Sequence, residues 1–271
     1  MPAEPLTVAC LLNGGRVRYK EVARAMAAGI NASGGHAVLT DLMAGTIKAD
    51  AAVMYGWKYR ERLRHYRQWI YADLGYWDRL GHYRLSVNSW SPDAYVRAGL
   101  PVTRLEALGV EVKPWRTGGD EVLLMGASAK SMHQHGHGYM QWETKTAQRL
   151  QKLGVKVVFR PKPNDVQKQP LPVAGVGYDE RPLDKALAAA WFVVTHHSNA
   201  AIDALVAGVP VHCETGAAAA FSVPIAQAAS PELLGGREQF LADVAWLQWT
   251  PDEMRSGAAW RHLIDRGVIR C

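Results

Sequence analysis

The sequence predicts an α/β fold of two domains with parallel sheets, residues 1–115 and 120–271, which face a cleft and end in C-terminal helices. Both halves repeat an order of apolar strand, polar turn and amphipathic helix. Residues 113–120, KPWRTGGD, have the proline, glycine and polar content of a linker between domains. A strand, a turn, a helix and a second strand follow one another within residues 191–214. Such alternation favours parallel strands connected by helices.

The first domain is expected to begin with a strand at residues 6–12, which ends in the turn Asn13-Gly14-Gly15-Arg16. Apolar positions then recur at helical spacing over residues 19–30. Short apolar runs predict further strands at residues 36–39, 51–55 and 69–74. In such a sheet, ligands bind beyond the carboxyl ends of the strands, so the turns that follow them are the candidate sites.

The second domain is expected to begin with a strand at residues 121–125 and a turn at 126–131. Helices are predicted at residues 138–153 and 182–190, with a strand at 155–160 between them. The C-terminal part is predicted to be helical at residues 231–245 and 251–265, with tryptophans that pack in the core.

Size and composition indicate a globular protein: 271 residues with 48% hydrophobic content can form two cores. Because no long apolar run and no basic segment before the short apolar N-terminal stretch are present, neither a membrane span nor a secretory signal is predicted, and the cytoplasm is the expected compartment. The cysteines at positions 10, 213 and 271 lack metal-ligand spacing and are expected to be reduced. The net charge of +6 favours an anionic partner.

The most informative segment is residues 191–214, WFVVTHHSNAAIDALVAGVPVHCE. A buried strand leads to the polar turn Thr195-His196-His197-Ser198-Asn199, and a helix over residues 200–207 follows. Ser198 or Asn199 is the predicted N-cap, which leaves free backbone N–H groups at the turn. A phosphate is the expected ligand. The alternative is an ordinary α/β turn whose histidines are merely polar.

This segment resembles the donor-binding element of GT-B glycosyltransferases and related capsule-polymer transferases. In those enzymes a histidine–serine turn precedes an alanine-rich helix, a GVPV strand and an acidic residue, which match the turn at 196–199, residues 208–211 and Glu214 here. Residues 159–163, FRPKP, resemble the R-P-H-P strand end of the same transferases, with Lys162 where histidine is usual. The resemblance implies two Rossmann-like domains, with a nucleotide-sugar donor bound by the C-terminal half.

A donor diphosphate needs hydrogen-bond donors and positive charge, which this chain can supply without a metal, so no cofactor is predicted to be required. Arg160, Lys162 and Lys130 provide the charge, and Glu214 is expected to accept hydrogen bonds from ribose hydroxyls. A UDP-sugar is the favoured donor. The predicted donor-binding residues are Gly126, Ser128, Lys130, Arg160, Lys162, His196, His197, Ser198, Asn199 and Glu214.

Residues 132–137, MHQHGH, carry His133, His135 and His137 at alternate positions, a pattern that can bind zinc. Alternate residues converge on one ion only in an extended strand, and the glycines here indicate a mobile loop. The preferred interpretation is therefore a loop over the donor site with one histidine touching phosphate, and no metal site is predicted.

Asp73 lies at the end of a predicted strand, where a carboxylate is expected to face a ligand. A direct-displacement transferase needs one carboxylate to remove the acceptor proton, and Asp73 is the predicted general base, with Asp78 as the alternate. A carboxylate that only caps a turn is the other interpretation. The predicted acceptor-binding residues are Gly14, Gly15, Arg16, Lys58, Arg62, Arg79 and Arg84.

Residues 58–67, KYRERLRHYR, are basic and carry two tyrosines. They form either a solvated helix face or a surface that follows a phosphate backbone. The second interpretation, with the short chain, extends the resemblance to phage DNA glucosyltransferases, which modify hydroxymethylated bases. Double-stranded DNA is then the acceptor and the cytoplasm of a bacterial host the compartment; otherwise the acceptor is a carbohydrate or a small molecule.

Two further functions fit the same sequence features. A non-catalytic nucleotide- or nucleic-acid-binding module would keep the fold and its phosphate turns. A sugar-nucleotide epimerase shares the fold but needs several acidic residues around the sugar.

Overall fold

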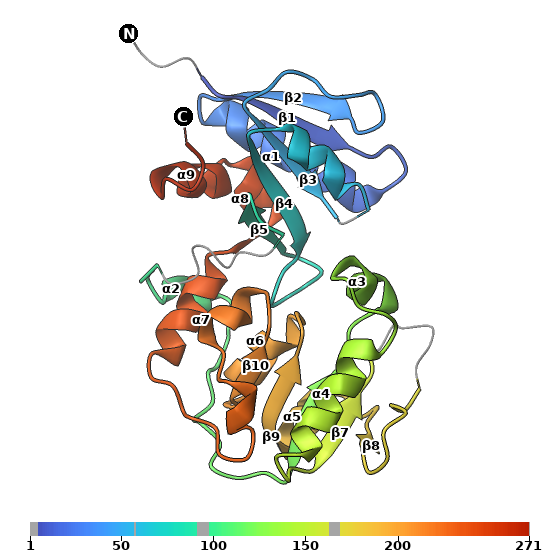
Figure 1. Cartoon of the computed structure of the whole chain (residues 1–271). Coiled ribbons are helices and arrows are strands. Elements are labelled where there is room, and N and C mark those ends of the chain that lie inside the picture. The colour runs from blue at the N-terminus through green and yellow to red at the C-terminus, as the bar shows by residue number, and fades with distance from the viewer. Residues whose placement is uncertain (1–4, 57, 91–97, 163–168, 271) are drawn as a thin grey trace. The chain divides into compact units, whose positions relative to one another are not determined.

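The computed structural model describes residues 5–56, 58–90, 98–162 and 169–270, and the chain divides into two compact units (Figure 1). Unit 1 comprises Met1–Tyr95 and Val244–Cys271, and unit 2 comprises Val96–Asp243. The sequence predicts a boundary at residues 115–120 and assigns the last helices to the second domain. The structure instead divides the chain after Tyr95, and its C-terminal segment belongs to unit 1.

Among the described residues, unit 1 contains a six-stranded sheet in the order β11-β5-β4-β3-β1-β2. Strands β2, β1, β3 and β4 are parallel, as predicted, but β5 is antiparallel to β4 and β11 is antiparallel to β5. The connection between β4 and β5 is too short for the crossover that parallel pairing requires, which is typically a dozen or more residues. The strands are β1 Thr7–Leu12, β2 His36–Asp41, β3 Ala51–Tyr55, β4 Gln68–Leu74, β5 Tyr83–Val87 and β11 Gln248–Trp249.

Helix α1, Val17–Ala32, packs on β1, β2 and β3 and also contacts two C-terminal helices, α8 Pro251–Arg255 and α9 Ala258–Asp265. Figure 1 shows the red C-terminal helices beside the blue α1. The sequence predicts one helix over residues 251–265, but Gly257 adopts a left-handed conformation, with φ of 83°, and divides it. A 3₁₀ helix, η1 Arg60–His65, occupies the basic segment between β3 and β4.

Both faces of the unit 1 sheet are covered. Val8 and Cys10 of β1 belong to one buried cluster, whereas Ala9 and Leu11 belong to another. Successive side chains of a strand point to opposite faces, so β1 lies between two apolar layers. This explains why its sequence is a continuous apolar run rather than an alternating one.

Unit 2 contains, in its described part, a five-stranded sheet in the order β10-β9-β6-β7-β8, and all its pairs are parallel as predicted. The strands are β6 Glu121–Met125, β7 Val157–Arg160, β8 Gly177–Tyr178, β9 Ala190–Thr195 and β10 Val211–Cys213. The helices are α2 Thr103–Ala107, α3 Ala129–Gln134, α4 Gln141–Gln151, α5 Leu183–Ala189, α6 Ala200–Val206, and the 3₁₀ turns η3 Ala217–Phe221 and η4 Ile225–Gln227. Helix α7, Arg237–Ala245, spans the boundary between unit 2 and the C-terminal segment of unit 1. Nowhere in the described chain is a helix both long and apolar enough for a membrane span.

The predicted linker is part of unit 2. The Lys113 N–H donates to Val206 O, and the Arg116 N–H donates to Gly208 O, each over 2.9 Å. The buried guanidinium of Arg237 lies 3.8 Å from the centre of the Trp115 ring. The proline and glycine content of this segment therefore marks a strap packed on unit 2 and not a free connection between domains.

Candidate functional site

The carboxyl ends of β6, β7 and β9 share one edge of the unit 2 sheet. Met125, the last residue of β6, is in register with both Arg160 of β7 and Thr195 of β9. The predicted charged segment and the predicted histidine turn therefore lie at the same edge. They are separated by one intervening strand, or about 10 Å of backbone spacing. That both groups hold one ligand remains a prediction.

The histidine turn connects β9 to α6. The Thr195 hydroxyl is fully buried and donates to Met125 O over 3.3 Å. Asn199 is the N-cap residue, but its side chain makes no capping hydrogen bond. Instead, the Ser198 hydroxyl accepts from the Ala200 N–H at 3.2 Å. Local hydrogen bonds of this kind are typical of serine in turns, and they fix the turn in which the histidines lie.

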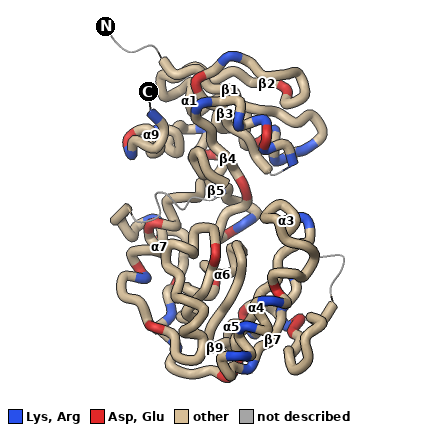
Figure 2. The backbone as a smooth tube through the Cα atoms, in the orientation of Figure 1, with Lys and Arg blue, Asp and Glu red and all other residues tan. Residues whose placement is uncertain are grey.

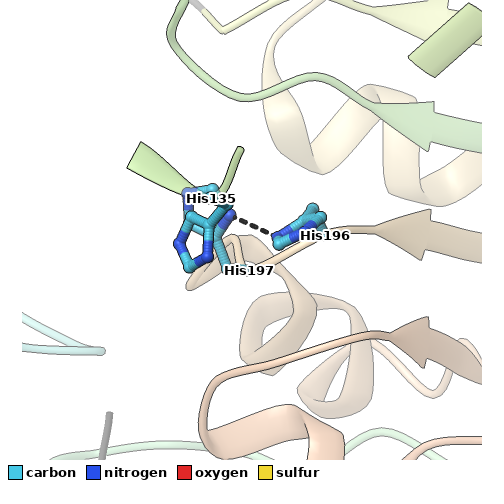
Figure 3. A group of neighbouring side chains, drawn as sticks. All are labelled: His135, His196 and His197. Carbon is cyan, nitrogen blue, oxygen red and sulfur yellow. Dashed lines mark hydrogen bonds between the residues drawn. The ribbon is translucent and has the colours of Figure 1, made fainter. Parts of the chain in front are cut away.

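Three imidazoles converge at this turn (Figure 3). His196 and His197 follow β9, whereas His135 follows α3, and one ring nitrogen of each lies within 4.8 Å of the other two. The Nδ1 atoms of His196 and His197 are 2.9 Å apart. His137 adds a ring contact to His196 at 5.3 Å between centroids.

Side chains from other segments contact the Nε2 atoms of His196 and His197. Ser131 Oγ lies 2.5 Å from His197 Nε2, and Glu214 Oε2 lies 3.6 Å from His196 Nε2. Glu214 in turn accepts a hydrogen bond from the Trp142 indole at 2.7 Å, and the Trp142 ring packs edge-on against His196. The acidic residue of the sequence motif therefore contacts the first histidine of the turn directly.

Burial is the largest cause of the lowered pKa of His196, and together with the neighbouring imidazoles of His135 and His137, against the opposing effect of Glu214, it brings this pKa to about 4. The ring is therefore neutral near pH 7. A neutral imidazole can donate one hydrogen bond or bind a metal, but it offers no net positive charge to a phosphate.

The predicted cations of the donor site have different surroundings. Lys130 and Lys162 are exposed, whereas the Arg160 side chain is buried and donates to the carbonyl oxygen of Arg181. Ser128 caps α3 by accepting from the Ser131 N–H at 3.3 Å. The backbone N–H of Gly126 donates to Arg160 O at 2.9 Å.

The segment after β6 differs from the predicted mobile loop. Residues 129–134 form α3, and the chain turns back after it, with the His135 and His137 N–H groups both directed to Met132 O at 2.9 and 3.0 Å. The histidine run is therefore folded into a turn rather than extended. One of its members, His135, joins the two histidines of the other turn.

In unit 1, Asp73 lies near the carboxyl end of β4, as predicted. The Tyr71 hydroxyl donates to Oδ2 and the Leu74 N–H donates to Oδ1, each at 2.8 Å, while an Arg84 nitrogen lies 3.5 Å from Oδ2. Burial, together with the charge of Asp73, raises the pKa of Tyr71, so its hydroxyl remains a donor. The carboxylate is 36% exposed, which leaves it accessible to a ligand.

The other predicted acceptor residues are spread over unit 1. Gly14, Gly15 and Arg16 form the exposed turn between β1 and α1. Lys58 is exposed, and Arg62 lies in η1. Arg79 Nε donates to Tyr76 O at 3.1 Å, and Arg84 contacts Asp73. The alternate base Asp78 is exposed and lies 3.2 Å from His82 Nδ1.

Three pairings were not predicted: Trp142 with Glu214, Ser131 with His197, and Tyr71 with Asp73. Trp142 and Ser131 belong to helices, and their contacts join segments that are distant in the sequence. Tyr71 and Asp73 are two residues apart on one strand and therefore share a face, a signal that the sequence did contain.

Comparison with known proteins supports the fold. The chain is similar to two solved structures of KpsC from Thermosulfurimonas dismutans. For the beta Kdo 2,4 transferase the TM-score is 0.52 with 14% identity, over 89% of this chain and 91% of the other. For the beta Kdo 2,7 transferase the TM-score is 0.50 with 12% identity, over 96% of this chain and all of the other. No protein-family model and no curated protein sequence matches the chain. The predicted fold class, with two Rossmann-like units of the GT-B type, is thus confirmed.

Proposed function

We propose that this protein is a glycosyltransferase that binds a nucleotide-sugar donor in unit 2 and transfers the sugar to an acceptor hydroxyl. The observation that carries the proposal is the contact between Glu214, after β10, and His196, after β9, at the carboxyl edge of a parallel sheet. These are the acidic and histidine positions of the donor-binding motif that the sequence resembles. The fold shared with the two solved Kdo transferase structures supports the same class of reaction.

The donor would lie against the turns after β6, β7 and β9. His197 and Ser198 offer hydrogen bonds there, and the exposed Lys130 and Lys162 offer the positive charge that neutral His196 lacks. Charge-assisted contacts stabilise a leaving phosphate more as its negative charge grows in the transition state. A nucleoside diphosphate sugar, with a UDP-sugar favoured, is the proposed donor class.

In the proposed reaction, the acceptor oxygen forms a bond to the anomeric carbon and the bond from that carbon to the phosphate oxygen breaks. The electron pair of the broken bond leaves on the phosphate, and the acceptor proton passes to a carboxylate. Asp73 is the proposed acceptor of that proton, because Tyr71 and Arg84 orient a carboxylate that remains partly exposed.

Donor binding is tested by thermal shift and calorimetry with a panel of nucleoside mono- and diphosphates. A specific ligand at 100 times its Kd is expected to stabilise the protein by about 2.7 kcal/mol. His197→Ala and Lys162→Ala should weaken binding, whereas Lys185→Ala, which removes an exposed lysine of α5, should not. If no nucleotide binds the wild type, the proposed donor site is wrong.

Turnover is tested by incubation with nucleotide sugars and analysis of the products. Asp73→Asn should reduce transfer by about 100- to 10,000-fold while donor affinity stays nearly unchanged. Asp184→Asn, at an exposed carboxylate of α5, is the control. Release of an epimerised sugar nucleotide instead of a transferred sugar would identify an epimerase, and binding without either product would identify a non-catalytic module.

The acceptor is proposed to be DNA, with a carbohydrate or a small molecule as the alternative. Arg60 and Arg64 each lie within 3.3 Å of Glu61 and contact the Trp90 ring, so the basic segment is partly neutralised by its own residues. Figure 2 marks its basic and acidic positions between β3 and β4. A duplex held by this segment should lose affinity with salt, with a log–log slope of about −0.9 per phosphate contact.

The salt titration therefore compares the wild type with Arg62→Ala. If Arg62 contacts a phosphate, its removal should make the slope shallower by about one unit and leave donor binding intact. Modification of hydroxymethylated DNA would identify the base acceptor. An absence of DNA binding at low salt would exclude DNA and favour a carbohydrate or small-molecule acceptor.

A further inference from the structure

We infer that His135, His196 and His197 form a binding site for a divalent transition-metal ion of the zinc type. This site goes beyond the proposed transfer reaction, for which the sequence predicts no required cofactor. The sequence pattern suggested zinc only for the run that contains His133, His135 and His137. In the structure, His135 instead lies beside His196 and His197, which come from a distant segment.

The spacing of the three rings is that of a three-histidine metal site (Figure 3). The ring centres of His135 and His196 are 4.7 Å apart, those of His135 and His197 are 4.7 Å apart, and those of His196 and His197 are 5.0 Å apart. Imidazoles bound to one tetrahedral ion at 2.0–2.1 Å from their nitrogens place their ring centres about 5 Å apart. One ion can therefore contact all three rings after small side-chain movements.

The orientation of the His196 and His197 rings supports the same assignment. His196 and His197 direct the same atom, Nδ1, at each other across 2.9 Å. Their Nε2 atoms face oxygens, Glu214 Oε2 at 3.6 Å and Ser131 Oγ at 2.5 Å. Where Ser131 Oγ accepts from His197 Nε2–H, a lone pair remains on His197 Nδ1, which is the arrangement that outer partners impose on metal-binding histidines.

The two Nδ1 atoms form a hydrogen bond when one of them carries a proton, and a cation between them would take the place of that proton. A tetrahedral ion would separate the two nitrogens to about 3.3 Å, a little more than the distance found here. The exposed His135 completes the set from the opposite segment. Three protein ligands leave one tetrahedral position for water or for an oxygen of a bound ligand.

The chemistry of the ligands selects the class of ion. Imidazole nitrogen suits zinc, cobalt, nickel and copper, whereas magnesium and calcium prefer oxygen ligands. The carboxylate of Glu214, which contacts the His196 ring, is also held by a hydrogen bond from the Trp142 indole. The site is accordingly expected to bind zinc and cobalt and to leave magnesium unbound.

The test uses the full chain without an affinity tag, freed of metal by a chelator and titrated with cobalt(II). One cobalt ion per chain is expected, with the intense visible absorption of a tetrahedral complex, and zinc(II) should displace it while magnesium should not. His135→Ala should abolish the spectrum. Because His135 is exposed, this variant should fold, which circular dichroism checks.

Two further variants separate this site from adventitious binding. Ser131→Ala removes the oxygen at His197 Nε2 and should weaken cobalt binding by about 10- to 100-fold. His133→Ala, at an exposed residue of the same helix, should bind as the wild type does. A wild type without the cobalt spectrum, or a His135→Ala variant that retains it, would overturn the assignment. Both readouts are independent of nucleotide binding and of turnover.

Discussion

The Trp142 indole donates to Glu214 across 2.7 Å, although 72 positions separate the two residues in the sequence. Trp142 belongs to α4, and Glu214 follows β10. The hydrogen bond therefore connects α4 to the segment just after β10, where Glu214, the acidic residue of the proposed donor site, lies. It occupies one carboxylate oxygen of Glu214, while the other lies nearer to His196.

The coupling between these two residues is measurable in a double-mutant cycle. Trp142→Phe and Glu214→Ala should each destabilise unit 2, and the interaction energy in urea unfolding should be about 0.5–1.5 kcal/mol. The control cycle pairs Trp142→Phe with Asp184→Ala, which removes an exposed carboxylate of α5. That cycle should be additive within about 0.5 kcal/mol. An additive result for Trp142 and Glu214 would contradict a stabilising bond.

Because α8 packs closely on α1, replacing Gly29 of α1 with alanine is predicted to lower stability rather than raise it. A Cβ at Gly29 of α1 would lie 1.9 Å from Met254 O of α8. Alanine in a helix interior normally stabilises relative to glycine by about 1 kcal/mol. Gly29→Ala should instead destabilise by roughly 1–3 kcal/mol, because the two helices must move apart.

Urea unfolding of Gly29→Ala measures this sign directly. The control is Ala28→Gly, at the neighbouring exposed position of α1. This variant should lose about 1 kcal/mol of stability, because glycine has a lower helix propensity than alanine. Stabilisation by Gly29→Ala would show that α8 does not pack on α1 at this distance.

The positions of several strands were predictable because buried parallel strands have short, continuous apolar sequences. The predicted strands at 51–55 and 121–125 have the bounds of β3 and β6. Tyr83–Val87 was not predicted as a strand, since its sequence YRLSV lies in a stretch rich in polar and aromatic residues. Gln248–Trp249 is too short to produce a periodic signal, and its pairing with β5 is what ties the C-terminal segment to unit 1.

The candidate site was predictable only where its residues are adjacent in the sequence. His196, His197 and Ser198 occupy the predicted turn after β9. The contact between Ser131 and His197 spans 66 positions, and local patterns carry no information about such a pairing. The burial of Arg160 and its bond to Arg181 O also depend on the packing of neighbouring segments, which spacing alone does not reveal.

The acid sensitivity of unit 2 should depend on Asp179. Burial alone would raise the pKa of Asp179, but hydrogen bonds from Arg181, and its charge, outweigh burial and lower that pKa. A carboxylate with a lower pKa in the folded state stabilises the protein above its unfolded pKa of about 3.9. This stabilisation is lost as the pH falls from that value through the folded pKa.

Asp179→Asn should therefore reduce the free energy of unfolding at pH 7 by roughly 1–2 kcal/mol. This loss is smaller than that expected for a fully buried charged hydrogen bond, because Arg181 remains partly exposed to solvent. The difference between variant and wild type should shrink as the pH falls below about 4. Chemical unfolding at a series of pH values measures both effects. Asp184→Asn, at an exposed position, is the control. A difference that stays constant down to low pH would contradict the proposed role of the charge.

The strap formed by residues 113–116 predicts a second test on a glycine. Gly208 has φ of 77°, and a Cβ there would lie 2.0 Å from Pro114 O. Gly154 has nearly the same backbone conformation, with φ of 75°, but a Cβ there would meet no atom within 4 Å. Gly154→Ala should therefore destabilise the protein only by the strain of placing alanine in a left-handed conformation, roughly 1–2 kcal/mol.

Gly208→Ala carries the same conformational cost and must also displace the strap, which adds roughly 1–3 kcal/mol of overpacking. The difference between the two variants in urea unfolding isolates the close approach of Pro114, because the backbone strain is common to both. Gly208→Ala should also weaken the hydrogen bond from the Arg116 N–H to Gly208 O, and faster hydrogen exchange at the Arg116 amide would detect this change. Equal destabilisation of the two variants, with unchanged exchange at Arg116, would mean that residues 113–116 are a free linker after all.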